Sequence, residues 1–320
     1  MKNLRIVFMG TAEFAVATLG SLLMNGFNVV GVVTAPDKPS GRGRKITKSP
    51  VREFAEFSYL PIMQPENLKD AGFVESLRKL NADLFIVVAF RMLPEVIWKM
   101  PPSGTINLHA SLLPHYRGAA PVNRAIMNGE TMTGVTTFFI DEKIDTGMIL
   151  LREGIQIFPS ENAGDVHDRL MKLGARLVIR TIEEITNGTV KPQPQSKFLR
   201  EGEVPREAPK IFPDDCQIDW NNEPVKIHNL IRGLAPYPGA KSILKTGNEK
   251  RSFKIFESLP ENGNHVLKPG FLISDGKHYI KVACRNGYIN ILNLQVEGKT
   301  RMNIVEFLRG YDISNSIVVS

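Results

Sequence analysis

Apolar runs alternate with amphipathic stretches through more than half of the chain. Leu4–Phe8, Val29–Val33 and Leu84–Ala89 are almost continuously apolar, as is typical of strands buried on both faces of a parallel sheet. Further strands are predicted at Pro61–Met63, Thr105–Leu108, Val135–Ile140 and Ile149–Phe158, and helices at Glu13–Met24, Val51–Phe57, Gly72–Leu80, Ala119–Met127 and Ala163–Ile185. This alternation indicates a doubly wound α/β domain with a mainly parallel sheet.

The composition changes after the last of these helices, whose N-terminus we expect Ser160 to cap. Residues 187–210 are rich in proline, glutamine and charge, which is typical of a linker. Beyond them a helix is predicted at Val225–Leu234, followed by strands at Ala240–Leu244, Ser252–Phe256, Gly270–Ser274, His278–Ala283 and Tyr288–Leu294. Short strands at this spacing favour a small barrel or sandwich. The predicted organisation is an α/β domain at 1–188, a linker at 189–207 and a smaller β domain at 208–320.

Charge is unevenly distributed along the 320 residues. With 40 Lys+Arg and 33 Asp+Glu the formal charge is +7, and two segments carry the excess. Residues 36–54 contain six basic and two acidic residues, and residues 206–320 contain sixteen and twelve, so each has a net charge of +4. Such clustering is typical of a surface that contacts phosphate, although many basic stretches are only solvated surface. The prolines and glycines of the first segment predict a loop without helix or strand from 36 to 50.

Composition also excludes several classes of protein. Hydrophobic residues make up 42% and charged residues 23% of the chain, which fits a soluble globular protein. No apolar run reaches the roughly 18 residues that cross a bilayer, and the N-terminal run reads as a buried strand rather than a signal peptide. Cys216 and Cys284 lie outside any CxxC motif, and the histidines lack metal-ligand spacing. We therefore expect a cytoplasmic protein without a disulfide scaffold or a metal.

The stretch from residue 105 to 147 carries the candidate chemistry. Asn107 and His109 alternate with apolar neighbours, so in an extended strand both point to one face. Asp145 lies in the loop after the next predicted strand. An amide can stabilise an oxyanion, an imidazole can exchange protons and a carboxylate can orient the imidazole, which together suit acyl transfer. On spacing alone, a structural Asn-x-His pair and an ordinary turn aspartate remain an open alternative.

Other catalytic motifs are missing from the sequence. The first strand-to-helix turn, Met9–Glu13, has a single glycine where dinucleotide-binding proteins have GxGxxG, which disfavours NAD. Neither a P-loop nor the GxSxG of a serine nucleophile occurs, and Ser111 reads as a loop residue.

The sequence resembles the folate-dependent formyltransferases. INLHASLLPHYRGAAPVNRAI (106–126) followed by GVTTFFIDEKIDTG (134–147) is similar to the catalytic signature of that family. IVFMGTAEFAVATL (6–19) and APDKPSGRGRKITKSPV (35–51) resemble the members that act on initiator tRNA, while CQIDW (216–220) and IRGLAPYPGA (231–240) resemble the start of their C-terminal barrel. The resemblance covers nearly the whole chain and implies a Rossmann-like formyltransferase domain followed by an OB-like, tRNA-binding β-barrel.

The resemblance also implies a reaction: the formyl group of 10-formyltetrahydrofolate is transferred to the α-amino group of methionyl initiator tRNA for translation initiation. Asn107 and His109 would stabilise the tetrahedral intermediate, and Asp145 would assist proton transfer. The implied folate contacts are Phe90, Met92, Leu93, Ser111, Leu112, Leu113 and Pro114, and the implied tRNA contacts are Arg42, Arg44, Lys45 and Lys48. We expect a monomer.

Two departures from the family pattern stand out. AFRMLP at 89–94 replaces a usual Tyr-Gly pair, which affects the lining of the pterin pocket, and Tyr237 replaces a usual Trp. One alternative is another folate enzyme, either a formyltransferase acting on a small amine or a formyltetrahydrofolate hydrolase, neither of which needs the loop at 37–48. The other alternative is a catalytically idle nucleic-acid-binding protein, against which the intact set of Asn107, His109 and Asp145 argues.

Overall fold

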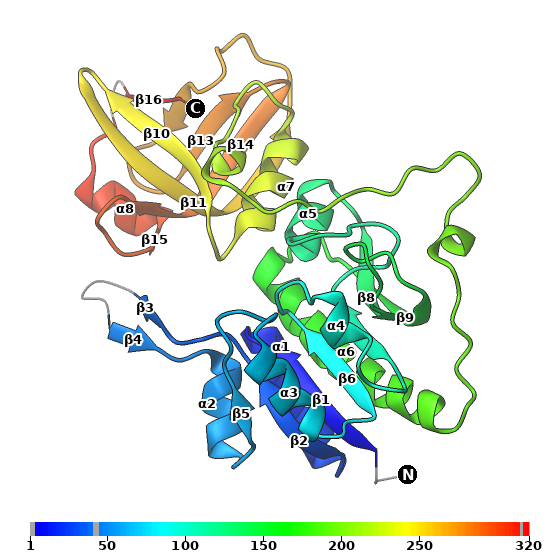
Figure 1. Cartoon of the computed structure of the whole chain (residues 1–320). Coiled ribbons are helices and arrows are strands. Elements are labelled where there is room, and N and C mark those ends of the chain that lie inside the picture. The colour runs from blue at the N-terminus through cyan, green and yellow to red at the C-terminus, as the bar shows by residue number, and fades with distance from the viewer. Residues whose placement is uncertain (1–3, 41–44, 314–315, 320) are drawn as a thin grey trace. The chain divides into compact units, whose positions relative to one another are not determined.

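The computed structural model describes residues 4–40, 45–313 and 316–319 and divides into two compact units (Figure 1). The first unit lies within residues 1–118, 133–155 and 167–207, and the second within 119–132, 156–166 and 208–320. Each unit therefore combines parts of the chain that are distant in sequence. Residues 189–207, which we predicted to be a linker, belong to the first unit.

The first unit is built on a seven-stranded sheet. Its strands are β1 (Arg5–Gly10), β2 (Asn28–Val33), β5 (Ile62–Met63), β6 (Leu84–Val88), β7 (Thr105–His109), β8 (Met132–Phe139) and β9 (Ile149–Gln156). They lie in the order β5-β2-β1-β6-β7-β8-β9, and the pairs from β5 to β7 are parallel, whereas β8 is antiparallel to β7. Residues Ile6 to Met9 are fully buried, as expected of a strand covered on both faces. The predicted doubly wound, mainly parallel sheet is confirmed.

Helices cover both faces of this sheet. They are α1 (Glu13–Met24), α2 (Pro50–Phe57), α3 (Ala71–Lys79), α4 (Glu95–Trp98) and α6 (Ala163–Thr186). On one face Val7 of β1 and Val87 of β6 form a hydrophobic cluster with Leu77 of α3 and Ile97 of α4. This cluster buries apolar side chains from four elements, which ties α3 and α4 to the sheet.

The opposite face of the sheet packs against α6. A Cβ at Gly174 would lie 2.7 Å from Leu108 Cδ2, so the helix approaches β7 closely. Because successive strand residues point to opposite faces, Leu108 faces α6, and Asn107 and His109 face the side of α3 and α4. The two polar candidates thus interrupt a face that is apolar on the neighbouring strand, where Val87 pairs with Asn107.

The basic segment is more ordered than its composition predicts. Lys38–Ser40 (β3) and Lys45–Thr47 (β4) pair as an antiparallel ribbon in which Pro39 lies opposite Ile46. The prediction of a loop without strands was therefore wrong. Both strands of a two-stranded ribbon are edge strands, so the missing N–H of a proline can lie on the unpaired side.

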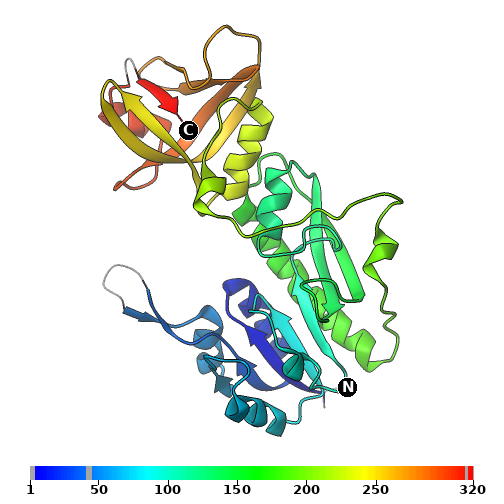
Figure 2. The same ribbon diagram turned by 45° about the horizontal axis from the view of Figure 1, so that its top comes forward.

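The second unit is a nearly closed β-barrel with flanking helices (Figure 2). Its helices are α5 (Pro121–Met127), α7 (Pro224–Leu234) and α8 (Ile304–Gly310). Its strands are β10 (Ala240–Thr246), β11 (Glu249–Asn262), β12 (Leu272–Ser274), β13 (Ile280–Cys284), β14 (Gly287–Val296), β15 (Met302–Asn303) and β16 (Ser316–Val319). The short 3₁₀ helix Pro213–Cys216 belongs to this unit, and the similar Gln195–Phe198 belongs to the first.

The barrel closes between its two edge strands. The sheet order is β12-β13-β14-β11-β10-β16, and an antiparallel bridge between Phe271 and Ile317 joins the region of β12 to β16. Trp220, Phe253 and Phe307 are buried in its core. The predicted small barrel is confirmed, whereas α8, β15 and β16 were not predicted from the sequence.

The long helix α6 begins with a cap that differs from the predicted one. The side-chain oxygen of Asn162 accepts hydrogen bonds from the backbone N–H groups of Gly164 at 2.8 Å and Asp165 at 3.2 Å. Asp165 Oδ2 in turn accepts from the N–H of Asn162 at 3.0 Å. The prediction that Ser160 caps the helix was wrong, because Ser160 lies too early in the chain to reach these donors.

The corrected cap gives a direct test. We expect Asn162→Ala to lower the free energy of unfolding by about 1 kcal/mol, because two N–H groups of the first turn lose their acceptor. Chemical denaturation followed by circular dichroism measures the change. Ser160→Ala is the matched control and should change stability by no more than a few tenths of a kcal/mol. A larger loss for Ser160→Ala than for Asn162→Ala would contradict the cap.

Candidate active site

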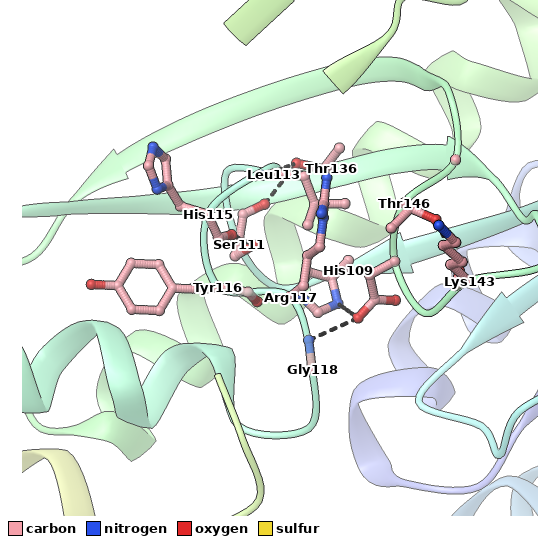
Figure 3. Close-up of polar contacts among 12 residues, drawn as sticks. His109, Ser111, Leu113, His115, Tyr116, Arg117, Gly118, Thr136, Lys143 and Thr146 are labelled. Carbon is pink, nitrogen blue, oxygen red and sulfur yellow. Dashed lines mark hydrogen bonds and ion pairs between the residues drawn. The ribbon is translucent and has the colours of Figure 1, made fainter. Parts of the chain in front are cut away.

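His109 ends β7, at the carboxyl edge of the parallel strands. The residue is only 7% exposed, and its Nε2 lies 2.7 Å from the backbone oxygen of Tyr116. A carbonyl oxygen only accepts, so Nε2 carries a proton and donates it. The other ring nitrogen, Nδ1, lies 3.6 Å from Oδ2 of Asp145 (Figure 3). The ring is therefore anchored through Nε2, and Nδ1 faces a carboxylate beyond hydrogen-bond length.

Asp145 is held mainly through one of its two oxygens. Oδ2 accepts a hydrogen bond of 2.9 Å from the backbone N–H of Gly118 and also faces His109 (Figure 3). No hydrogen bond from the residues that the structure describes reaches Oδ1. The carboxylate thus has one oxygen bound to the protein and another that can accept from a ligand or a water.

The approach of Asp145 to His109 requires a loop that folds back. Phe139 near the end of β8 pairs with Ile106 near the start of β7, three residues or about 10 Å along the strand from His109. The following loop covers this distance with Asp145 at a φ of 55°, a left-handed conformation that aspartate tolerates better than most residues. At Gly147 a Cβ would lie 1.7 Å from the Phe139 oxygen, so the loop accepts only glycine there.

Asn107 is the third predicted member of the site. It lies two residues before His109 on the same face of β7 and is half-buried. Its side-chain amide makes no hydrogen bond with any residue within the described parts of the chain. The N–H donors of the amide are therefore available to bind an oxygen atom of a ligand.

The loop that follows β7 is fixed by its own polar contacts. Ser111 Oγ donates to the backbone oxygen of His115 at 2.7 Å. Thr136 Oγ1 on β8 donates to the backbone oxygen of Ser111 at 2.6 Å and accepts from the N–H of Leu113 at 3.2 Å (Figure 3). These buried bonds hold the loop in the shape that brings its later carbonyl and N–H groups to His109 and Asp145.

The residues predicted to contact folate differ in accessibility. Leu93, Ser111, Leu113 and Pro114 are buried, Phe90 and Leu112 are half-buried, and Met92 is exposed. Leu113 packs against Phe138 and Ile149, and Leu93 lies in the cluster of α3 and α4. Both leucine side chains are therefore part of the core and would meet a ligand through backbone atoms. Met92, which is 65% exposed, is the most accessible apolar side chain of the set.

The predicted tRNA contacts lie on or next to the β3–β4 ribbon. Arg42 and Arg44 are outside the described residues, and Lys45 begins β4. Lys48 Nζ forms an ion pair of 2.6 Å with Glu56 Oε2 of α2. The cations of Lys48 and Arg52 hold the pKa of Glu56 below its ordinary value. Of the four predicted contacts, Lys48 thus already has an acidic partner within the protein.

Two residues of this site were not predicted. Gln195, in the segment predicted to be a linker, donates a hydrogen bond of 2.8 Å to the backbone oxygen of Asp145. Arg117 donates to the Gln195 side-chain oxygen at 2.7 and 3.0 Å. Arg117 lies within the motif that carries the family resemblance, whereas a glutamine in a Pro- and Gln-rich stretch has no sequence pattern to mark it.

Metal and membrane features were searched in the described part of the chain. Among those residues, no group of three or more His, Cys, Asp or Glu side chains could hold a metal ion. None of the described helices is both long and apolar enough to cross a membrane.

The class of protein is defined by its architecture and its site. A Rossmann-like sheet carries Asn107 and His109 at the carboxyl end of β7, where the loop after β8 places Asp145, and a β-barrel follows it. The family model for formyl transferases matches residues 4–182, and the model for the formyl transferase C-terminal domain matches residues 210–312. The chain therefore belongs to the formyl transferase family, and the resemblance seen in the motifs is confirmed.

Two curated relatives are similar to this chain over almost its whole length. Methionyl-tRNA formyltransferase of Flavobacterium johnsoniae is 53% identical over 319 residues, which cover 100% of both chains. Methionyl-tRNA formyltransferase of Bacteroides fragilis is 51% identical over 316 residues, 98% of this chain and 97% of the relative.

Solved structures agree in fold. WlaRD, a sugar 3N-formyl transferase crystallised with dTDP and 5-N-formyl-THF, has a TM-score of 0.63 at 21% identity and covers 93% of this chain and 99% of its own. HypX from Aquifex aeolicus in complex with tetrahydrofolic acid has a TM-score of 0.62 at 19% identity and covers 96% of this chain and 48% of its own. At these identities the likeness supports the architecture alone.

The role of the Thr136 hydroxyl in holding the loop after β7 can be tested. We expect Thr136→Val to lower the free energy of unfolding by about 1–3 kcal/mol, because the buried oxygen of Ser111 and the N–H of Leu113 both lose their partner. Thr131→Val, at the exposed residue directly before β8, is the control and should leave stability nearly unchanged. Equal stability of the two variants in urea denaturation would contradict the assigned role.

Proposed function

We propose that this chain transfers the formyl group of 10-formyltetrahydrofolate to the α-amino group of methionyl initiator tRNA. The observation that carries the proposal is identity of 51–53% over nearly the whole chain to proteins named methionyl-tRNA formyltransferase. The solved relatives bound to 5-N-formyl-THF or tetrahydrofolic acid support a folate as the formyl donor. The contact between His109 and Asp145, with Asn107 beside it on β7, supplies the groups that such a transfer needs.

Asn107, His109 and Asp145 have different roles in the proposed reaction. The amine of the acceptor attacks the formyl carbon, whose bond to N10 of the folate then breaks, and one proton passes from the amine to N10. The free amide of Asn107 donates a hydrogen bond to the oxygen that becomes negative. His109 Nδ1, which lies 3.6 Å from Asp145 Oδ2, is placed to exchange a proton at the same centre. Oδ1 of Asp145 accepts the proton of the amine, directly or through a water.

The second unit is proposed to hold the tRNA. Residues 206–320 carry a net charge of +4, and a small basic barrel is a common platform for nucleic acids. We accordingly propose 1–188 as the formyltransferase domain and 208–320 as the tRNA-binding domain, connected by residues 189–207, which pack within the first unit. We further propose that the enzyme acts as a monomer, and that its role in translation initiation places it in the cytoplasm.

Asp145→Asn tests the proposed chemistry. The amide retains the shape of the carboxylate but accepts no proton, so we expect formyl transfer to methionyl initiator tRNA to fall by at least 100-fold in kcat. The affinity for the folate should stay within about twofold, because the substitution leaves the apolar surroundings unchanged. Radiolabelled formyl transfer and fluorescence titration measure the two quantities. Turnover like that of the unaltered enzyme would refute the role of Asp145.

Arg42→Ala tests the proposed tRNA contact. Because a cation that neutralises one phosphate releases counterions, its loss should raise the KM for tRNA and reduce the slope of log KM against log salt by about 0.7–0.9. Lys69→Ala, at an exposed position outside the basic segment, is the control and should leave both unchanged. An Arg42→Ala enzyme with an unchanged salt slope would argue that Arg42 touches no phosphate.

A further inference from the structure

Gln195 is the most buried polar side chain of the segment that we predicted to be a linker. It begins a short 3₁₀ helix, Gln195–Phe198, and is only 5% exposed. The segment is tied to the first unit on both sides of this residue. Gln193 and Ile149 exchange backbone hydrogen bonds of 2.8 and 2.9 Å, and the N–H of Tyr116 donates to the oxygen of Arg206.

The side-chain amide of Gln195 joins the two loops that carry the site. Its Nε2 donates to the backbone oxygens of Asp145 at 2.8 Å and Gly147 at 3.0 Å, both in the loop after β8. Its Oε1 accepts from Nε of Arg117 at 3.0 Å and from Nη2 at 2.7 Å, in the loop after β7. Both N–H groups and both lone pairs of the amide are therefore used.

The partners allow only one orientation of this amide. A guanidinium only donates and a backbone oxygen only accepts, so Oε1 must face Arg117 and Nε2 must face the two carbonyls. A glutamate at this position could still accept from Arg117 but would place an acceptor against two acceptors. The site thus requires the amide and not merely a side chain of this size.

These bonds act on Asp145 from two directions. Gln195 holds its backbone oxygen, while Gly118, the neighbour of Arg117, holds its Oδ2 at 2.9 Å. The loop has to keep Asp145 in a left-handed conformation at a φ of 55°. External hydrogen bonds sustain such a conformation in a loop that would otherwise relax.

We propose that Gln195 is a positioning residue for Asp145, and that residues 193–207 thereby form part of the active site. Gln195 links the loop after β7, whose Tyr116 oxygen binds His109, to the loop after β8 that carries Asp145. It therefore sets the distance between the imidazole and the carboxylate. Displacement of a reacting group by about 1 Å costs up to about 100-fold in rate. This inference rests on the proposed formyl transfer.

Gln195→Ala and Gln195→Glu test the inference in the full-length enzyme. We expect each to lower kcat by about 10- to 100-fold and to leave the KM for the folate donor within about twofold. Gln195→Glu conserves the volume and the contact with Arg117, so it separates positioning from packing. Ser196→Ala, at the exposed next residue, is the control and should keep the activity of the unaltered enzyme. Unaltered kcat in a folded Gln195→Glu enzyme would overturn the inference.

Combination with Asp145→Asn distinguishes this inference from the proposed function. If Gln195 acts through Asp145, adding Gln195→Ala to Asp145→Asn should cause no further loss in single-turnover transfer. Losses that multiply would overturn the inference, because they would show a separate route of action. An Asp145→Asn enzyme that is fully active would refute the assigned chemistry itself, whereas an inactive Asp145→Asn with an active Gln195→Glu would refute only the role of Gln195.

Discussion

The candidate site depends on a loop that must fold back along the sheet to bring a carboxylate to an imidazole. β8 runs antiparallel to β7, so the chain leaves β8 at the end of the pair that is remote from His109. Asp145 reaches His109 because Gly147 lets the backbone pass against Phe139 and because Asp145 adopts a left-handed conformation. Glycine allows this close approach and aspartate tolerates the left-handed conformation, which explains why the turn carries a DTG sequence.

Next to the contact between His109 and Asp145, polar side chains interrupt an otherwise apolar face of the sheet. β6 presents Val87 to the cluster of α3 and α4, whereas the neighbouring β7 presents Asn107 and His109 to the same side. His109 recovers the cost of burial through Tyr116, but Asn107 has no such partner among the described residues. The fold thus places at this position an amide whose N–H donors can bind a ligand.

Local patterns predicted most elements of the fold. The helix predicted at Glu13–Met24 is observed at the same residues, and the strand predicted at Leu84–Ala89 is observed as β6 at Leu84–Val88. Continuous apolar runs and helical periodicity are properties of the segment itself. The β3–β4 ribbon escaped prediction because proline and glycine usually interrupt strands, yet a two-stranded ribbon has only edges. The helix α8 and the strand β16 escaped it because short elements with a few apolar residues depend on the barrel they close.

The sequence by itself determined the class of the protein and the chemical groups of the site. Residue types and spacing within residues 105–147 made Asn107, His109 and Asp145 candidates, and the resemblance of that segment to the formyltransferase signature favoured them over ordinary structural residues. Only the tertiary structure decided how these groups are held. Gln195 lies fifty residues beyond Asp145, and its amide acquires a role only when Arg117 and the Asp145 carbonyl meet it in space. Hydrogen bonds between distant segments depend on how the whole chain packs, which no local periodicity records.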